Sequence, residues 1–99
     1  EVELVNAIGA LPGHSLRINI FERFSKLGYR FKTIVSPYAI VSSYAKLSEG
    51  VQVMPCAVIQ AGVVVGECTI INTSSTLEHD CIIGKHSHIA PGAVVCGQP

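Results

Sequence analysis

The chain has 99 residues, enough for one compact domain or for parts of two. Its seven basic and seven acidic residues cancel, which argues against binding to nucleic acid or an anionic membrane, and no apolar run approaches the roughly 20 residues of a membrane-spanning helix. The four cysteines form no CxxC pair, so we predict reduced thiols and a cytoplasmic protein. From the charge balance and the lack of a long apolar run, we expect no nucleic-acid or membrane partner.

Residues 1–34 predict a strand, a helix and a second strand. The segment 1–9, which ends at Gly9, is typical of a buried strand. Residues 15–27 carry apolar side chains at helical spacing, with Ser15 as the N-cap and Gly28 as the stop, and residues 29–35 form the second strand. Such a unit is too small to enclose a core. We therefore interpret residues 1–34 as the C-terminal part of a small α/β (Rossmann-like) domain, and the chain as a fragment of a longer protein.

Residues 35–99 repeat with a period of six. A helix would repeat about every 3.6 residues and an ordinary strand every 2. Counted from Val35, every sixth residue is Ile, Leu or Val, and the residue four positions after each of them is small in nearly every repeat. The pattern therefore predicts short strands joined by tight corners, with one aliphatic side chain of each repeat pointing inward. These eleven aliphatic residues are Val35, Val41, Leu47, Val53, Ile59, Val65, Ile71, Leu77, Ile83, Ile89 and Val95.

This pattern resembles the hexapeptide-repeat family, whose coils are triangular prisms with three hexapeptides per turn. The resemblance implies a left-handed parallel β-helix over residues 35–99, truncated at its end, in which residues 18 apart stack. The left hand is an exception to the usual right-handed crossover. The third residue of each hexapeptide then lies at a corner of the prism. The three corner columns read Pro37, Pro55, Thr73 and Pro91; Glu49, Glu67 and Lys85, a solvated charged edge; and Ser43, Ala61, His79 and Gly97.

The sixth residue of each hexapeptide is expected to point outward from a flat face. Aliphatic side chains stacked on an outer face need cover, and the simplest cover is another copy of the chain. The residues alone therefore predict an oligomer, and the resemblance implies a homotrimer. The outward columns are Ile40, Val58, Thr76 and Val94; Lys46, Val64 and Ile82; and Gln52, Ile70 and His88.

The segment 71–93 narrows the resemblance. It carries Asn-Thr, then Glu-His-Asp-Cys at residues 78–81, and a second histidine nine residues after the first. This set resembles the sialic acid O-acetyltransferases and UDP-4-amino-sugar N-acetyltransferases among the hexapeptide-repeat acyltransferases. In that family an N-terminal α/β domain binds the nucleotide sugar, and Ala7-Ile8-Gly9 matches the second half of that domain. The resemblance thus implies that Gly9, Asn72 and Thr73 contact a nucleotide-sugar substrate.

His79 is the only large polar side chain in its corner column, and we expect it to be the catalytic base. Acetyl transfer needs a proton removed from the attacking nucleophile, and an imidazole titrates near neutral pH. Asp80 can accept a hydrogen bond from one ring nitrogen and so fix the tautomer. Gly97 lies one coil above His79, about 4.8 Å away, and its backbone N–H is the candidate oxyanion donor. The resemblance assigns His79 and Asp80 the same roles.

The remaining histidines receive weaker assignments. The resemblance puts His88 near acetyl-CoA, although His88 lies half a coil from His79, so that only a neighbouring subunit could bring the two together. Gly13-His14 is a faint likeness of a Gly-His that contacts the nucleotide sugar, and we interpret it as a loop. His86 is expected to be a solvated corner residue, and Cys81 a packing residue.

Three functions remain open. The first is acetyl transfer from acetyl-CoA to the amino group of a nucleotide-linked amino sugar, and the second is O-acetylation of a sialic-acid-like sugar by the same residues. The third is a zinc enzyme similar to the γ-class carbonic anhydrases, which bind metal through three histidines from two subunits. His79, His86 and His88 have a different spacing, and the His79-Asp80 pair suits acid–base chemistry better, so no metal is expected.

Overall fold

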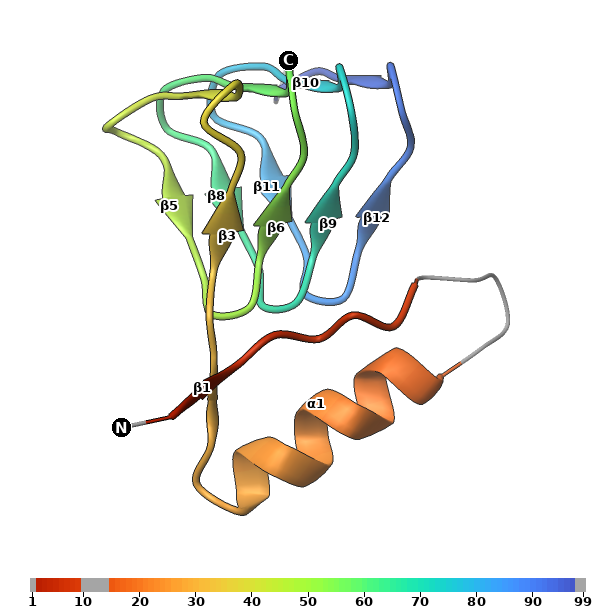
Figure 1. Ribbon diagram of the computed structural model, residues 1–99. Helices are drawn as coiled ribbons and strands as arrows, with labels where there is room; N and C mark the ends of the chain where they lie inside the picture. Colours follow the sequence, from red (N-terminus) through yellow and green to blue (C-terminus); the bar gives the residue numbers. More distant parts are fainter. Residues whose placement is uncertain (1, 10–14, 98–99) are drawn as a thin grey trace.

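The computed structural model describes residues 2–9 and 15–97, so Gly13-His14 and Pro99 lie outside the described residues. Its first part is a strand–helix–strand unit made of β1 (Glu3–Leu4), α1 (Leu16–Lys26) and β2 (Arg30–Phe31). The two strands are parallel, with Leu4 opposite Phe31. Its second part is a stack of short strands, and Figure 1 shows α1 running beside one corner of that stack. In the described part of the chain, no helix has the length and apolar character needed to cross a membrane.

The predicted helix is confirmed, and its two ends are built differently. At its start, the Ser15 carbonyl accepts the first helical hydrogen bond from the Asn19 N–H, but the Ser15 hydroxyl caps no backbone N–H. At its end, the Gly28 N–H donates to the Ser25 carbonyl and the Tyr29 N–H donates to the Phe24 carbonyl. This is the Schellman arrangement, which requires a left-handed residue, and Gly28 has a φ of 91°.

The two predicted N-terminal strands are too long. The strand expected over residues 1–9 is limited to β1, because β1 has only the two-residue strand β2 as a neighbour. The strand expected over residues 29–35 is divided between β2 and β3 (Ile34–Val35), which belong to different sheets. The chain therefore passes from the first part to the second at residues 32–33.

The second part is a parallel β-solenoid with the topology expected of hexapeptide repeats. Its strands form three sheets with the orders β12-β9-β6-β3, β13-β10-β7-β4 and β11-β8-β5, which amounts to between three and four coils. Each strand of this part pairs in parallel with a strand 18 residues away, as the resemblance to the hexapeptide-repeat family implied. The strands after β3 are β4 (Ile40–Val41), β5 (Lys46–Leu47), β6 (Gln52–Val53), β7 (Val58–Ile59), β8 (Val64–Val65), β9 (Ile70–Ile71), β10 (Thr76–Leu77), β11 (Ile82–Ile83), β12 (His88–Ile89) and β13 (Val94–Val95).

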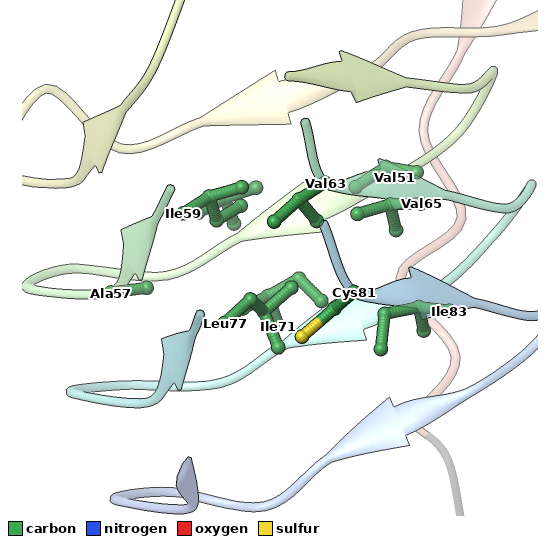
Figure 2. Close-up of a cluster of buried hydrophobic side chains, with 10 residues drawn as sticks. Val51, Ala57, Ile59, Val63, Val65, Ile71, Leu77, Cys81 and Ile83 are labelled. Carbon is green, nitrogen blue, oxygen red and sulfur yellow. The ribbon is translucent and has the colours of Figure 1, made fainter. Parts of the chain in front are cut away.

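The predicted inward positions form the core of the solenoid. Figure 2 shows side chains from the three sheets pointing into one interior, which the aliphatic side chains of the middle coils fill. Those nearer the two ends, such as Val41 and Ile89, are only half-buried. Val35 is 42% exposed, although it was expected to be a core residue. It pairs with Val53 on one side only, because no described coil lies below it.

The corners are two-residue turns, and most of them require a left-handed second residue. Gly50, Gly62 and Gly92 meet this requirement without steric cost. At five other corners a residue with a side chain adopts the same conformation, with φ between 58° and 64°. Each such residue costs about 1–2 kcal/mol relative to an ordinary backbone conformation. These five residues are Cys56, Cys68, Ser74, Asp80 and His86.

The corner expected to be a solvated charged edge is covered by the strand–helix–strand unit at Glu49 and Glu67, whereas Lys85 is exposed as expected. Phe21 of α1 and Phe31 of β2 are buried in one cluster with Cys68 of that corner. The Glu49 carboxylate accepts a hydrogen bond from the Phe31 N–H at 2.7 Å, so it is used to join the two parts. In the same corner column Glu67 is half-buried. Sequence periodicity describes only the solenoid, and it therefore missed this cover.

A second contact joins the two parts through Asn6, which is 5% exposed. Its side-chain amide donates to the Arg17 carbonyl in α1, and its side-chain oxygen accepts the Ile8 N–H. Its backbone carbonyl accepts a hydrogen bond from the Gln52 side chain of β6 at 2.8 Å. Because a buried amide must be satisfied, these bonds fix the segment after β1 against both α1 and the solenoid.

Candidate active site

His79 and Asp80 form the corner between β10 and β11, and the predicted contact between them is present. The His79 Nδ1 lies 3.1 Å from the Asp80 Oδ2. Because an ionised carboxylate only accepts hydrogen bonds, Nδ1 is the donor and carries the proton of the neutral ring. Nε2 then holds a free lone pair. Both side chains are mostly exposed, at 74% and 70%, so the pair orients the ring and adds little to stability.

The backbone of this corner is held by the coil below it. The Asp80 N–H donates to the Ala61 carbonyl at 3.0 Å, and the Cys81 N–H closes the turn by donating to the Glu78 carbonyl at 3.3 Å. Asp80 has a φ of 64°, a conformation that aspartate tolerates better than most residues with a side chain. The backbone conformation therefore fixes the direction from which the Asp80 carboxylate reaches the imidazole.

Two glycines lie directly above and below the pair. A Cβ atom added to Gly97, in the coil above, would overlap the carbonyl oxygen of His79. A Cβ atom added to Gly62, in the coil below, would overlap the Asp80 Oδ1. The predicted stacking of Gly97 on His79 is thus present, whereas the aim of the Gly97 N–H at an oxyanion stays a prediction. The sequence analysis did not single out Gly62, although its position 18 residues before Asp80 was a usable signal.

A second polar cluster lies on another face and joins three predicted site residues. The Asn72 side-chain oxygen accepts the Thr73 N–H at 2.9 Å, which leaves its amide nitrogen as a donor. That nitrogen lies 3.1 Å from the His88 Nε2, which is therefore the acceptor, and Nδ1 of His88 carries the proton. His88 belongs to β12, in a different sheet from β10 and β11. Within one chain, therefore, no described contact joins His88 to His79.

Gly9 lies beyond β1 and is exposed, with nothing within 4 Å of an added Cβ. No described hydrogen bond links it to either histidine cluster. Its role in binding the acceptor therefore stays a prediction based on the resemblance of Ala7-Ile8-Gly9.

His86 is not the solvated residue that the sequence suggested. Its ring packs edge-on against Phe21 of α1, with the ring centroids 5.6 Å apart. Its Nδ1 is buried and has no hydrogen-bond partner among the described residues. Burial lowers the pKa of His86, because removal from water disfavours the charged imidazolium. His86 therefore joins the two parts of the fold, and it is poorly placed to act as a metal ligand.

The cysteines of the repeats are free thiols, and Cys81 is a packing residue. Cys81 is buried as predicted, its sulfur lies 3.2 Å from the Val95 carbonyl oxygen, and burial raises its thiol pKa. All four cysteines are free. Across residues 2–9 and 15–97, no group of three or more His, Cys, Asp and Glu side chains is arranged to hold a metal ion.

Comparison with known proteins finds similarity to transferases built from hexapeptide repeats. Residues 64–97, from β8 to the end of the described chain, match the family described as bacterial transferase hexapeptide (six repeats). A curated relative is the 2,3,4,5-tetrahydropyridine-2,6-dicarboxylate N-succinyltransferase of Methylobacterium sp. (strain 4-46). It is 37% identical over 76 residues, which are 77% of this chain and 25% of the relative.

Two solved structures resemble the chain more specifically. One is a histidine-to-asparagine variant of perosamine N-acetyltransferase from Caulobacter crescentus in complex with CoA and GDP-perosamine. It has a TM-score of 0.80 and 32% identity, and the match covers 83% of this chain and 39% of that one. The other is the acetyltransferase domain of PglB from Neisseria gonorrhoeae in complex with acetyl coenzyme A, with a TM-score of 0.78 and 39% identity over 80% and 38% of the two chains.

The repeat match and these two structures support the hexapeptide acyltransferase family. They do not single out the sialic acid O-acetyltransferases within that family. The chain spans about a quarter of the length of the succinyltransferase and less than half of each of the two solved chains.

Proposed function

We propose that the protein transfers the acetyl group of acetyl-CoA to the amino group of a nucleotide-linked amino sugar. The observation that carries this proposal is the His79–Asp80 pair, exposed on a corner between two glycines and oriented at 3.1 Å. Of the two solved relatives described above, one is an N-acetyltransferase in complex with CoA and GDP-perosamine, and the other is an acetyltransferase domain in complex with acetyl coenzyme A. The N-acetyltransferase favours the amine acceptor over the hydroxyl acceptor of the O-acetylation alternative.

In the proposed reaction, His79 acts through its unprotonated Nε2. The acceptor nitrogen attacks the thioester carbonyl carbon, and Nε2 takes the proton that this nitrogen loses. The new C–N bond forms, the C–S bond breaks, and the imidazolium returns its proton to the leaving CoA sulfur. Asp80 keeps Nδ1 protonated throughout, so that Nε2 is always the reacting nitrogen. The Gly97 N–H stabilises the negative charge on the carbonyl oxygen in the tetrahedral intermediate.

The donor is proposed to bind between subunits of a homotrimer. Because His88 and His79 lie on different faces of one chain, a partner subunit is needed to complete a site that uses both. The Nδ1–H of His88, fixed by the Asn72 contact, is then a donor for acetyl-CoA. The outward columns supply apolar surface for such an assembly, since Ile40, Ile82 and Val94 are 67%, 73% and 62% exposed. In this proposal Asn72 and Thr73, which belong to the same cluster as His88, contact the nucleotide-sugar substrate.

The N-terminal residues are proposed to belong to the domain that holds the nucleotide sugar. In this proposal residues 1–34 are the end of a small α/β domain of Rossmann type, residues 35–99 are a left-handed β-helix, and Gly9 contacts the acceptor. The parallel order of β1 and β2, connected through α1, supports this division. The protein would work in the cytoplasm, where acetyl-CoA and nucleotide sugars are available.

The test is acetyl transfer by the full-length protein, followed as release of free CoA thiol. Acetyl-CoA and succinyl-CoA are offered with matched nucleotide sugars that carry an amino group or a hydroxyl group. We expect turnover with acetyl-CoA and the amino sugar, and His79→Ala should lower kcat by about 10²–10⁴ with little change in the KM for acetyl-CoA. Near-full activity of His79→Ala would remove the proposed base. Activity lost to a chelator would point instead to a zinc enzyme.

A further inference from the structure

The Asp80 carboxylate has two oxygens in two different surroundings. Its Oδ2 contacts the His79 Nδ1 at 3.1 Å, and its Oδ1 lies in the space above Gly62. A Cβ atom at residue 62 would overlap this Oδ1 and would lie 3.1 Å from the Asp80 Cγ. The carboxylate therefore occupies a volume that any side chain at residue 62 would claim.

The conformation of the corner does not by itself demand glycine at residue 62. Gly62 has a φ of 78°, but five equivalent corner residues carry side chains at φ between 58° and 64°. The coil to which Gly62 belongs tolerates such a residue at Cys56, only one corner earlier. What distinguishes residue 62 is the group stacked above it. Gly50 is the contrasting case, because it has a similar φ of 75° at a different corner, and a Cβ added there would lie 3.1 Å from the Cys68 sulfur.

We infer that Gly62 is a positioning residue for acetyl transfer, because its missing side chain lets the Asp80 carboxylate hold His79 in the Nδ1–H tautomer. The inference rests on the proposed function for its catalytic consequence, but its geometric content can be tested separately. Gly62 has no side chain that could react, and in this inference it acts only through Asp80.

The ladder of hydrogen bonds decides which atom moves when a methyl group is added. The backbone of residue 62 is held by the Gly62 N–H donating to the Tyr44 carbonyl at 3.1 Å, and that of residue 80 by the Asp80 N–H donating to the Ala61 carbonyl at 3.0 Å. The carboxylate rotates about single bonds and is 70% exposed, so it can turn away toward solvent. In Gly62→Ala the chain should therefore fold, while the Oδ2 contact with His79 is lost.

The first measurement is the tautomer of His79, recorded from imidazole ¹⁵N chemical shifts. The parent protein should show a protonated Nδ1 and an unprotonated Nε2. Gly62→Ala should shift this pattern toward the tautomer mixture of a free imidazole, as Asp80→Ala should. Gly50→Ala carries the same backbone penalty at a different corner without touching Asp80, and it should keep the parent pattern. Unchanged shifts in Gly62→Ala would overturn the inference, whether or not the protein is an acetyltransferase.

The second measurement is steady-state kinetics on the full-length enzyme. Gly62→Ala should lower kcat about 10²-fold, the loss expected when a catalytic group is displaced by about 1 Å, with the KM for acetyl-CoA unchanged. Gly50→Ala should stay within about twofold of the parent. Adding Gly62→Ala to Asp80→Ala should cost nothing further, because the two changes remove one interaction. Fully multiplied losses in the double variant would show that Gly62 acts by another route.

If every variant and the parent lack acetyl transfer while the ¹⁵N shifts follow the expected pattern, the proposed function fails and the positioning role of Gly62 stands. If the parent enzyme turns over and Gly62→Ala matches it, the positioning role fails and the proposed function stands.

Discussion

Leu77→Ala tests whether the solenoid interior is packed as tightly as its burial implies. Leu77 is fully buried in the middle of the stack, between Ile59 in the coil below and Val95 in the coil above. The substitution removes three carbon atoms, which is worth about 2.4 kcal/mol at about 0.8 kcal/mol for each buried CH₂ group. Both neighbouring strands are fixed by backbone hydrogen bonds, so the cavity cannot close fully and adds its own cost. The expected loss in the free energy of unfolding is about 3–5 kcal/mol.

The measurement is a urea titration at fixed protein concentration, with Leu27→Ala as the matched control. Leu27 undergoes the same chemical change but is 64% exposed at the end of α1, so its loss should stay below about 1 kcal/mol. For a chain of this size, 3–5 kcal/mol corresponds to a fall in Tm of at least about 12 °C. Equal losses in the two variants would refute the packing argument, since burial would then make no difference to the cost of the missing carbons.

Two further predictions concern assembly and pH. Val58→Glu and Ile82→Glu should each lower the oligomeric state in sedimentation velocity, because an unpaired charge is costly in an apolar interface. Tyr38→Glu, at an exposed corner, should leave the oligomeric state unchanged. Unchanged sedimentation of both Val58→Glu and Ile82→Glu would show that these faces are solvated. Burial lowers the pKa of His86 below 6.5, so the unfolded chain binds more protons than the folded chain as the pH falls. The contribution of His86 to the free energy of unfolding should therefore be fully present above pH 6.5 and be lost as the pH drops through the folded pKa. His86→Leu should reduce the change of the urea midpoint between about pH 7.5 and 5.5. An equally large fall of the midpoint in that variant would assign the pH dependence to other groups.

The sequence predicted the solenoid well because its repeat is local. An aliphatic residue every six positions is enough to define which side chains face inward, and the 18-residue spacing implied by the family resemblance then defines which of them stack. This is why the pairing of His88 with Ile70, and the stacking of Gly97 on His79, were both predictable. The contact of His79 with Asp80 was predictable for the same reason, since adjacent residues at one corner share one environment.

What the sequence could not predict depends on contacts between segments that the repeat does not relate. The cover of one corner by α1 makes His86 a packing residue and Glu49 a hydrogen-bond acceptor for Phe31. The bond between Asn72 and His88 depends on side-chain rotamers across two coils. Val35 was placed in the core because the period does not indicate where stacking stops.

The left-handed corners show where this solenoid holds a reserve of stability. Cys56 and Ser74 are exposed, and each adopts a left-handed turn conformation that is strained for a residue with a side chain but not for glycine. Substitution of these two residues by glycine should therefore stabilise the scaffold. Asp80 carries the same strain, but its carboxylate is the partner of His79. A scaffold optimised only for thermal resistance would choose glycine at all three places, and it would thereby remove the carboxylate that contacts His79. Under the proposed mechanism, the side chain at residue 80 serves catalysis at a cost in stability.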